Sequence, residues 1–475
     1  MTASVLPRLV IAGMSGDSGK TLVSLALLLG ARDRGMLVRA FKKGPDYIDA
    51  AWLTWASGSP ARNLDTFLAG ADGVTQAFAR HAVRAACQTI GAVNIIEGNR
   101  GLFDGMDAEG THSTAVLAKI LQAPVVLVLN ARKMTGTAAA LVRGCQAMNP
   151  DLRIAGVILN QVAGTRHADV AREAIERACA VPVVGVIPRL DEPDVLPGRH
   201  LGLVTPLEHL SIECVAGVLR RVAREHLDLD RILQSATTAW AGDEVVSPVD
   251  RTEIRAALSP PVTIGYLSDA AFSFYYPENL EALEARGATL APLSSLAGGP
   301  LPPGLAALYI GGGFPETHAA SLAANRPLLD SIRAAAARGL PIYAECGGLM
   351  LLANTVTWQG RRHTMAGVIP VDVEVLAAPQ GHGYVVLSVD RPNPFFAVGQ
   401  EIRAHEFHYS RIAGAVPDTA CAVLRGTGCG GGRDAIVVNQ AWASYAHVHA
   451  AGLPEWADGT IRAAREYQAK AGDPA

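Results

Sequence analysis

The chain has 475 residues and a formal net charge of −3 at pH 7, with 41 Lys and Arg against 44 Asp and Glu. At about 150 residues per domain, this length predicts two or three domains. Hydrophobic residues make up 49% and charged residues 18%, which favours a globular α/β protein over a disordered one. No run of Lys or Arg is long enough to follow a phosphate backbone, so nucleic acid is not an expected partner.

The N-terminal residues do not resemble an export signal. Pro7 and Arg8 fall where a signal peptide needs an unbroken apolar stretch. No apolar run elsewhere approaches the ~20 residues of a membrane-spanning helix. Seven scattered cysteines form no C-x-x-C pair, which argues against a disulfide framework and a structural zinc site. We therefore expect a cytoplasmic protein with no membrane partner.

Two regions alternate short apolar runs with amphipathic stretches, and a more polar segment separates them. Runs such as LVIAGM, PVVLVLNAR and PVVGVIPRL lie in residues 1–225 and predict a doubly wound parallel sheet. Residues 226–260 are rich in charge, Ser and Pro, as expected for a connector. Residues 261–475 repeat the strand and turn pattern and become more β-like toward the end. We predict two doubly wound α/β domains, 1–225 and 261–475, joined by the connector 226–260.

A glycine-rich loop follows the first apolar run and opens a helical stretch, which is the setting in which backbone N–H groups surround phosphates. Lys20 is expected to reach the terminal phosphates of ATP, and the Thr21 hydroxyl to take one position on Mg²⁺. Five residues separate Gly13 from Gly19 where four are usual, so the loop is a variant. The alternative is a glycine turn with an exposed lysine. The expected nucleotide-binding residues are Gly13, Ser15, Asp17, Ser18, Gly19, Lys20 and Thr21.

Acidic residues follow two further strand-like runs, in FKKGPDYID and IIEGNRGLFDG. Because ligands bind at the carboxyl edge of an open parallel sheet, these acids should lie near the phosphate loop. Asp46 and Glu97 are candidates to complete the magnesium site, while Asp104 and Tyr47 lie where a substrate could be positioned. Helix capping and turn formation are the alternative roles for each acid.

A cysteine between glycines marks a second candidate site. In PIYAECGGLM, Cys346 stands between a strand and an apolar helix, which predicts a nucleophile elbow. Its place at a helix N-terminus is expected to lower the pKa of the thiol. Gly347 and the glycine turn ending at Gly313 are candidate oxyanion donors. The alternative is a buried structural cysteine.

The base that activates such a thiol should be a distant histidine brought close by the fold. The candidates are His405, His408, His447 and His449, and the residues alone do not choose among them. Most histidines on strand-like runs are half-exposed sheet residues, so we expect at most one of the four to be the base.

Taken together and in this order, the motifs resemble the cobyrinic acid a,c-diamide synthase family, in which a dethiobiotin synthetase-like amidoligase domain is fused to a class I, flavodoxin-like glutamine amidotransferase domain. The matching stretches run nearly end to end and are GMSGDSGKT, FKKGPDYID, RNLDTF, EGNRGLFDG, PGRHLGL, YIGGGFPE, AECGGLM, HEFHYS and SYAHVH. The variant spacing of the phosphate loop is itself shared with dethiobiotin synthetase-like loops.

The resemblance implies roles for particular residues. Cys346 is then the glutaminase nucleophile and His447 the histidine that activates it. The acid that many class I amidotransferases carry two residues later is replaced by His449, so the group that orients His447 stays open. In the first domain the family positions fall on Asp46, Tyr47, Ile48, Glu97 and Asp104. They imply that ATP phosphorylates a carboxylate of a tetrapyrrole and that ammonia from glutamine displaces the phosphate.

Departures from the family pattern bear on the substrate. Ala50 to Leu53 follow GPDYID where proline and histidine are usual, and Gly198 stands where glutamate is common. Amidation of siroheme or sirohydrochlorin is therefore an alternative to amidation of cobyrinic acid. A second alternative is a deviant P-loop ATPase switch with an inactive amidotransferase half. Whether the chain forms a homodimer is left open.

Overall fold

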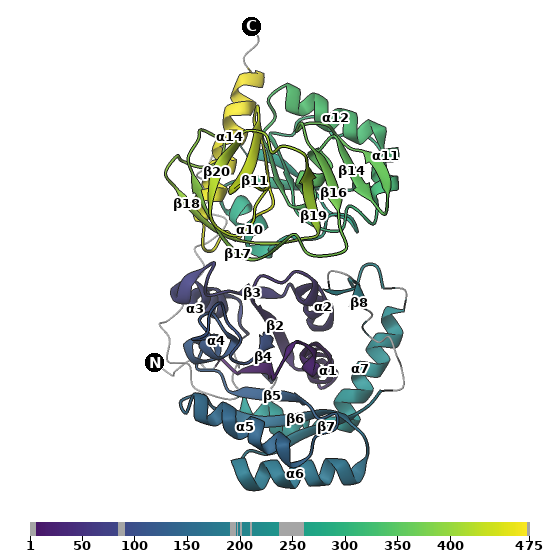
Figure 1. The fold of residues 1–475 in the computed structure, drawn as a ribbon, viewed down its shortest axis with the longest axis vertical. Helices are drawn as coiled ribbons and strands as arrows, with labels where there is room; N and C mark the ends of the chain where they lie inside the picture. Colours follow the sequence, from purple (N-terminus) through teal and green to yellow (C-terminus); the bar gives the residue numbers. More distant parts are fainter. Residues whose placement is uncertain are drawn as a thin grey trace. The chain divides into compact units, whose positions relative to one another are not determined.

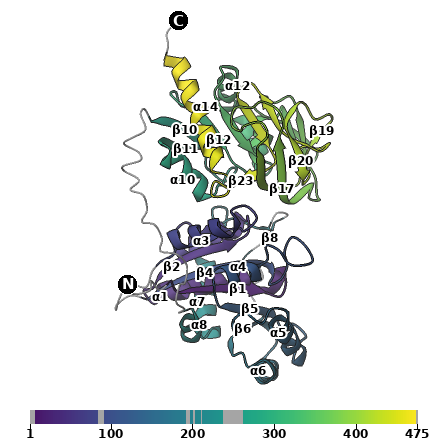
Figure 2. The ribbon, with the colours of Figure 1, turned by 90° about the vertical axis from the view of Figure 1, so that its left-hand side faces the viewer.

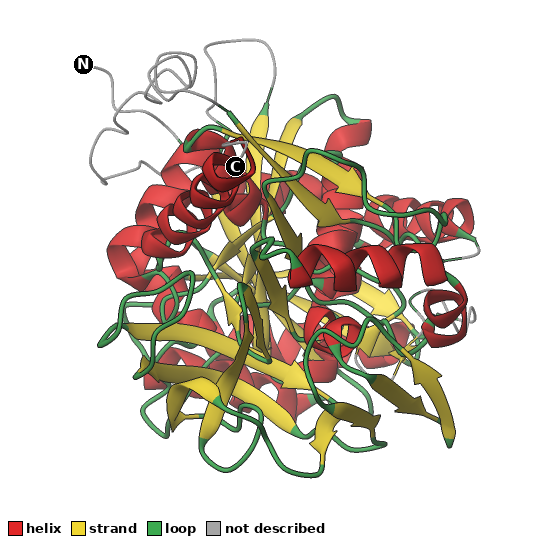
Figure 3. Ribbon diagram, turned by 90° about the horizontal axis from the view of Figure 1, so that it is seen from above, coloured by secondary structure: helices red, strands yellow, loops and turns green. Residues whose placement is uncertain are grey.

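The structure is a computed structural model that describes residues 6–83, 91–190, 196, 198–199, 202–209, 211–236 and 261–472. The described residues form two compact units, one within residues 6–66 and 70–236 and the other within residues 67–69 and 261–472. Helices and strands both occur along the described chain (Figure 3). The α/β class predicted from the sequence is confirmed.

A seven-stranded sheet forms the centre of the first unit, with every pair of neighbours parallel and the order β3-β2-β4-β1-β5-β6-β7. The chain moves from β1 to one side of the sheet, returns with β4, and continues with β5 on the other side. The edge beside β1 is therefore a topological switch point, where ligands bind in such sheets. The strands are β1 Arg8–Gly13, β2 Leu37–Lys43, β3 Arg62–Leu64, β4 Ala92–Gly101, β5 Val125–Asn130, β6 Ile154–Val162 and β7 Val183–Pro188, with a small hairpin of β8 Gly198–Arg199 and β9 Gly202–Leu203.

Helices cover this sheet, and the first begins directly after the phosphate loop. They are α1 Lys20–Asp33, α2 Ile48–Ser57, α3 Gly70–His81, α4 Thr114–Ile120, α5 Gly136–Met148, α6 Thr165–Cys179, α7 Ile212–His226 and α8 Leu229–Ser235, with a 3₁₀ turn, η1, at Gly16–Ser18. Helix α1 packs on α2 and α7, and α5 packs on α6 (Figure 1). From the predicted connector, α8 contacts β6 and β7. Residues 237–260 of that connector lie outside the described residues, and the predicted boundaries stay a prediction.

The second unit has a ten-stranded sheet in the order β11-β10-β12-β13-β22-β21-β20-β17-β18-β23. Its first five strands are parallel in the flavodoxin-like order, and the others extend the sheet with antiparallel pairs. The strands are β10 Val262–Leu267, β11 Ala288–Leu293, β12 Ala307–Ile310, β13 Ile342–Glu345, β17 Gly381–Val389, β18 Glu401–His408, β20 Thr419–Arg425, β21 Arg433–Val438, β22 Ala441–Ser444 and β23 His447–Val448.

A second, four-stranded sheet runs in the order β15-β14-β16-β19, from β14 Thr355–Trp358, β15 Arg361–Thr364, β16 Asp372–Val375 and β19 Ser410–Ala413. The helices of the unit are α10 Pro277–Ala285, α11 Ala319–Ala324, α12 Arg326–Ala337, α13 Gly347–Leu352 and α14 Pro454–Gly472. Helix α14 contacts α10, β10 and β12, beside which it runs in Figure 2. Every helix of the described residues is too short or too polar to cross a bilayer.

Two buried clusters line the two faces of the larger sheet, and the strands alternate between them. Leu308 of β12 and Ala344 of β13 belong to one cluster, whereas Tyr309 and Tyr343 belong to the other. Since successive side chains of a strand point to opposite faces, Glu345 at the end of β13 points to the same face as Tyr343. This alternation decides which groups surround the carboxylate beside Cys346.

Candidate active sites

The phosphate loop lies between β1 and α1 at the switch point of the first sheet. Gly19 has a φ of 96°, which favours glycine, and α1 begins at the next residue. The Lys20 Nζ donates to Ser15 O at 2.8 Å and to Gly16 O at 3.3 Å, so the lysine lies across the loop. Burial, and then the neighbouring Lys42, lower the pKa of Lys20 to about 8. The loop thus presents a cation and a helix N-terminus together.

Close packing explains the glycines of this loop. A Cβ on Gly19 would lie 2.2 Å from Nδ2 of Asn160, and the same Nδ2 donates to Ser18 O at 3.0 Å. A Cβ on Gly13 would lie 2.8 Å from Ser18 Oγ and 3.0 Å from Lys20 Nζ. Any larger residue at these two positions would displace groups that shape the loop. The predicted residues Ser15 and Asp17 lie between these two glycines. The backbone carbonyl of Ser15 accepts the hydrogen bond from Lys20, and Asp17 lies in η1.

A buried charge cluster lies beside the loop. Glu97 Oε1 accepts hydrogen bonds from Thr21 Oγ1 at 2.9 Å and from Lys42 Nζ at 2.8 Å. Lys42 also donates to Asp49 Oδ2 at 2.5 Å. The side chains of Lys42 and Glu97 are 1% and 0% exposed. Burial of Glu97 raises the pKa of its carboxyl despite the neighbouring lysine, and burial together with Asp49 raises the pKa of Asp46 to about 7.

The oxygens of this cluster fit a magnesium ion that is shared with nucleotide phosphates. Glu97 Oε2 is buried and accepts no hydrogen bond within the described part of the chain, and it belongs to the carboxylate that the Thr21 hydroxyl contacts. No group of three or more His, Cys, Asp or Glu among the described residues is arranged to hold a metal alone. Mg²⁺ needs few protein ligands when phosphate oxygens and water supply the rest.

The predicted substrate residues lie at the ends of β2 and β4. Asp46 lies just before α2, and its Oδ1 accepts from the backbone N–H of Asp49 in the first turn of that helix at 2.8 Å. Tyr47 is the N-cap of α2, and Ile48 is its first residue. Asp104 is exposed, and its Oδ2 accepts from Gly101 N at 2.8 Å, a turn contact. A role of these residues in substrate binding stays a prediction.

The segment that departs from the family pattern is partly in the core. Trp52 is fully buried, and its Nε1 donates to Val204 O at 2.9 Å. The ring also contacts Trp55 and His209 edge-on. Trp52 is therefore part of the core of the first unit.

Cys346 forms a strained elbow in the second unit. Its φ of 49° and ψ of −96° are unusual for a residue with a side chain, and they turn the chain from β13 into α13. Its N–H donates to Ser444 O at 2.7 Å. Burial, and then Glu316, raise the pKa of the thiol, and the Gly347 N–H opposes this without reversing it. The expected lowering of the thiol pKa by the helix terminus is thus wrong for this structure, because burial outweighs it.

The two predicted oxyanion donors lie next to each other. A Cβ on Gly347 would stand 3.2 Å from the backbone N of Gly313. Gly313 itself is packed so closely that a Cβ would come within 2.1 Å of Ala271 O. The backbone N of Gly313 thus lies close to Gly347, which directly follows Cys346, and two such neighbouring N–H groups are what an oxyanion hole requires.

His447 reaches the same place from the neighbouring strand. In the pairing of β13 with β22, Glu345 is opposite Ser444, so Cys346 and Tyr445 both follow at the carboxyl edge. The His447 ring lies against the glycine turn, since a Cβ on Gly312 would be 2.6 Å from its Cε1. Among the four candidate histidines, this position favours His447 as the base.

The other three histidines have different neighbours. His405 stacks on His447 with ring centroids 4.9 Å apart, and burial, then His447, lower its pKa. His408 faces Ser410 O through Nδ1 at 2.7 Å and Glu406 through Nε2 at 3.5 Å. His449 Nε2 lies 3.8 Å from Glu278 Oε2. None of these contacts directs a ring toward the glycine turn.

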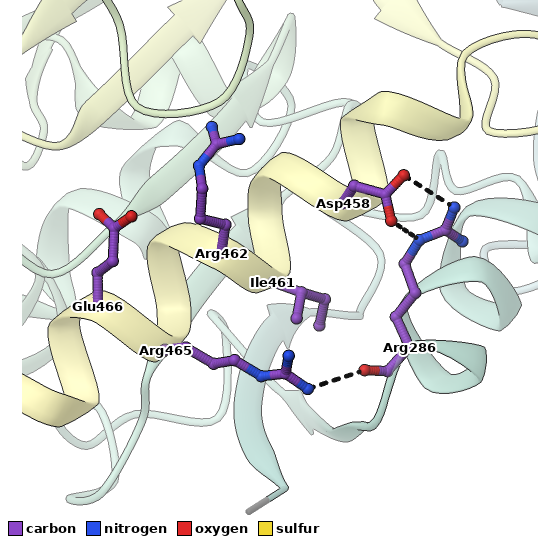
Figure 4. A pocket seen from close by; sticks show the side chains of 6 residues that line it. All are labelled: Arg286, Asp458, Ile461, Arg462, Arg465 and Glu466. Carbon is purple, nitrogen blue, oxygen red and sulfur yellow. Dashed lines mark hydrogen bonds and ion pairs between the residues drawn. The ribbon is translucent and has the colours of Figure 1, made fainter. Parts of the chain in front are cut away.

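A separate pocket lies between α10 and α14, and its polar groups are largely paired (Figure 4). Arg286 contacts both carboxylate oxygens of Asp458, at 2.5 and 3.2 Å, and Arg465 donates to the carbonyl of Arg286 at 3.4 Å. The lining residues are Arg286, Asp458, Ile461, Arg462, Arg465 and Glu466. They include no nucleophile, so this pocket belongs to neither candidate site.

Sequence reasoning missed three residues of these sites. Lys42 and Asp49 lie in the quoted FKKGPDYID stretch but carried no predicted role, although a lysine on a buried strand needs a counterion. Glu345 directly precedes the nucleophile and contacts His447. An acid at the end of a buried strand was the signal available for it.

The two sites define a class: a nucleotide-binding α/β domain joined to a glutamine amidotransferase domain. Residues 9–204 match the CobQ/CobB/MinD/ParA nucleotide binding domain, and residues 263–454 match the CobB/CobQ-like glutamine amidotransferase domain. Both domain types predicted from the sequence are confirmed.

Full-length relatives identify the family. A cobyrinate a,c-diamide synthase from Magnetococcus marinus is 43% identical over 97% of this chain and 98% of its own length. The one from Dehalococcoides mccartyi is 38% identical over 97% of this chain and 99% of its own length. The one from Methanosarcina acetivorans is 38% identical over 98% of this chain and 97% of its own length. The chain belongs to the cobyrinate a,c-diamide synthase family. Among solved structures, PurLQS from Thermotoga maritima covers 44% of this chain and 100% of its own at 15% identity and a TM-score of 0.34, too low to carry an argument.

Proposed function

We propose that this chain converts the a and c side-chain carboxylates of cobyrinic acid into amides, with ATP as energy source and glutamine as nitrogen donor, in the cytoplasm. The observation that carries the proposal is the presence, in one chain, of the Cys346 elbow and the phosphate loop. A nucleotide switch would not need the elbow. Relatives of nearly equal length that are named cobyrinate a,c-diamide synthase support the choice of substrate.

The second unit supplies ammonia in this proposal. The Cys346 sulfur attacks the side-chain amide carbon of glutamine while His447 takes the thiol proton, because the raised pKa of Cys346 leaves little thiolate beforehand. The N–H groups of Gly313 and Gly347 bind the oxyanion that forms. His447 then gives its proton to the departing ammonia, and water hydrolyses the thioester to release glutamate.

The first unit activates the carboxylate. Backbone N–H groups of the phosphate loop and Lys20 hold the ATP phosphates, and the γ-phosphoryl group passes to the substrate carboxylate to form an acyl phosphate. Ammonia attacks the acyl carbon and phosphate leaves. Thr21, Glu97 and Asp46 would hold Mg²⁺, which neutralises phosphate charge when bound. Asp46, Tyr47, Ile48 and Asp104 position the tetrapyrrole in this proposal.

Product mass tests the proposal. The enzyme is incubated with ATP, Mg²⁺ and glutamine, and with cobyrinic acid, sirohydrochlorin or siroheme in parallel. Each conversion of a carboxylate to an amide lowers the mass by about one unit. Two amidations of cobyrinic acid support the proposal, and amidation of siroheme or sirohydrochlorin alone overturns the proposed substrate.

Two variants separate the half-reactions in the same assay. Cys346→Ala should lose glutamine-dependent amidation and keep amidation supported by free ammonia. Lys20→Ala should lose amidation from either nitrogen source. If neither nitrogen source supports amidation of any tetrapyrrole by the unaltered enzyme, the proposed ligase activity is wrong.

A further inference from the structure

The histidine at the glutaminase site needs a group that fixes its ring. A general base of this kind is held in one tautomer by an acceptor at its second nitrogen. Two residues after His447, where many class I amidotransferases carry an acid, stands His449, whose own Nε2 faces Glu278 at 3.8 Å. An acid on another segment can take this role.

Glu345 lies where such an acid is needed. It is the last residue of β13, is fully buried, and directly precedes the nucleophile. Strand alternation points its side chain to the face of Tyr343 and Tyr309. The strand pairing sets Glu345 opposite Ser444, shortly before His447 in the chain.

The contacts of this carboxylate reach the histidine and its neighbour together. Glu345 Oε2 lies 3.4 Å from His447 Nδ1, an ion-pair contact that is longer than a usual hydrogen bond. The same oxygen accepts from the Tyr309 hydroxyl at 3.2 Å, and Oε1 accepts from the backbone N–H of Val448 at 3.2 Å. Two donors other than the histidine thus hold the carboxylate in place, one of them on the residue that follows His447. A buried charge with this many donors is fixed before substrate arrives.

We propose that Glu345 is the positioning acid of a Cys346–His447–Glu345 triad, supplied by the residue before the nucleophile. This inference rests on the proposed glutaminase roles of Cys346 and His447. In this triad Glu345 accepts a hydrogen bond from the Nδ1–H group of His447, which leaves Nε2 as the basic nitrogen on the edge that faces the glycine turn. Nδ1 keeps its proton throughout the reaction.

Glu345 also stabilises the positive charge that forms on His447 in the first step. When the sulfur–carbon bond forms, the thiol proton moves to Nε2 and the imidazole becomes a cation in a buried site. The neighbouring His405 ring stacks on it and adds no negative charge. The Glu345 carboxylate offsets the new positive charge, and the cation is neutralised again when the proton leaves with ammonia.

Comparable pairs in the same unit give the proposal a matched control. Among the described residues, Glu278 with His449 and Glu406 with His408 are also buried pairs of glutamate and histidine. His408 lies beside β17, since a Cβ on Gly381 would come 2.3 Å from its Nε2, and the His449 ring lies against the Tyr276 ring, with centroids 4.5 Å apart. His447 instead contacts the glycine turn, where a Cβ on Gly312 would meet its Cε1 at 2.6 Å.

The test compares Glu345→Gln with Glu278→Gln in the full-length enzyme. The amide of Glu345→Gln keeps an oxygen that can accept from Val448 and Tyr309 but removes the charge. We expect the kcat for glutamate release from glutamine to fall about 10²–10⁴-fold, by analogy with loss of charge in other triads, while the KM for glutamine changes less than about threefold. Amidation supported by free ammonia should stay within about twofold of the unaltered enzyme, because it does not use the triad.

Rescue by a conservative variant separates positioning from mere packing. Glu345→Asp keeps the charge at a shorter reach and should recover part of the rate that Glu345→Gln loses. Glu278→Gln should keep glutamate release within about threefold of the unaltered enzyme.

Two outcomes would overturn the proposal. Glu345→Gln could keep more than about a third of the normal rate of glutamate release, or it could lose activity only to the same extent as Glu278→Gln. Glutamate release is measured directly. An enzyme that hydrolyses glutamine but amidates no tetrapyrrole therefore contradicts the proposed substrate and still lets the role of Glu345 be judged.

Discussion

Replacing Lys42 with methionine would leave two carboxylates beside the phosphate loop without their cation. Lys42 Nζ lies 2.8 Å from Glu97 and 2.5 Å from Asp49, and its side chain is 1% exposed. Burial by itself lowers the pKa of this lysine, but Asp49 and Glu97 more than reverse the effect, so Lys42 keeps its charge. Removing one partner of a buried ion pair costs about 3–5 kcal/mol. Since Asp49 is 20% exposed and regains some water, we expect the lower end, about 3 kcal/mol.

Thermal unfolding of the full chain measures this cost. In a unit of this size, about 2–4 °C per kcal/mol converts the loss into a fall of about 6–12 °C in the Tm of the first unit's transition. Lys119→Met is the control, because Lys119 pairs with Asp151 at 3.3 Å with both side chains largely exposed, 46% and 79%. Its Tm should change by less than about 2 °C. A Lys42→Met enzyme as stable as the control would refute the reasoning.

Three further predictions concern other contacts. Gly19→Ala, with a φ of 96° and a new Cβ 2.2 Å from Asn160, should weaken ATP binding about tenfold or more in a fluorescent-nucleotide titration. Gly16→Ala, whose Cβ would meet nothing within 4 Å, should leave ATP binding unchanged. An equal loss of ATP affinity in the two variants would contradict the steric argument. Because burial and Glu316 raise the pKa of Cys346, its alkylation by iodoacetamide at pH 8 should be slower than that of the exposed Cys214 and should keep rising with pH; peptide mass spectrometry that finds Cys346 the faster would show this wrong. Glu406 accepts from Thr427 N and Gly428 N at 2.6 and 2.9 Å, and although burial raises the pKa of its carboxyl, His408 and these two donors lower it overall. The stabilisation by the ionised Glu406 is complete above its ordinary pKa of 4.5 and is lost as the pH falls through its lower pKa in the folded state. Glu406→Gln should therefore lower the free energy of unfolding, measured in urea, by about 1–3 kcal/mol at pH 7 and by less at pH 4. A difference between the two proteins that is larger at pH 4 than at pH 7 would contradict the assigned sign.

The features predicted well from the sequence are those that a short stretch determines by itself. The phosphate loop is such a stretch, since one strand, a glycine turn and Lys20 at a helix start follow each other directly. The elbow at Cys346 is another, because the residues on both sides set the turn. The α/β class and the parallel sheets follow from buried apolar runs in the same way.

Features that depend on strand register were not accessible. Which of four histidines borders the glycine turn depends on the pairing of β13 with β22, whose residues are about a hundred positions apart in the chain. The raised pKa of Cys346 was missed for a related reason: the effect of a helix terminus is visible locally, whereas burial by distant segments is not. The small sheet of β14, β15, β16 and β19 also joins segments separated in sequence, which no local periodicity reveals.

The two sites place their carboxylates by the same principle. Glu97 on β4 accepts from Thr21, which belongs to the phosphate loop after the neighbouring strand β1. Glu345 on β13 contacts His447, which follows the neighbouring strand β22. In each case the residue with an evident chemical role lies in a recognisable motif, and the acid that holds it comes from the adjacent parallel strand. An acid on the neighbouring strand can serve in this way because the carboxyl ends of neighbouring parallel strands meet at this edge. His449 in place of an acid after His447 is compatible with an active site for this reason: the carboxylate has its place on β13.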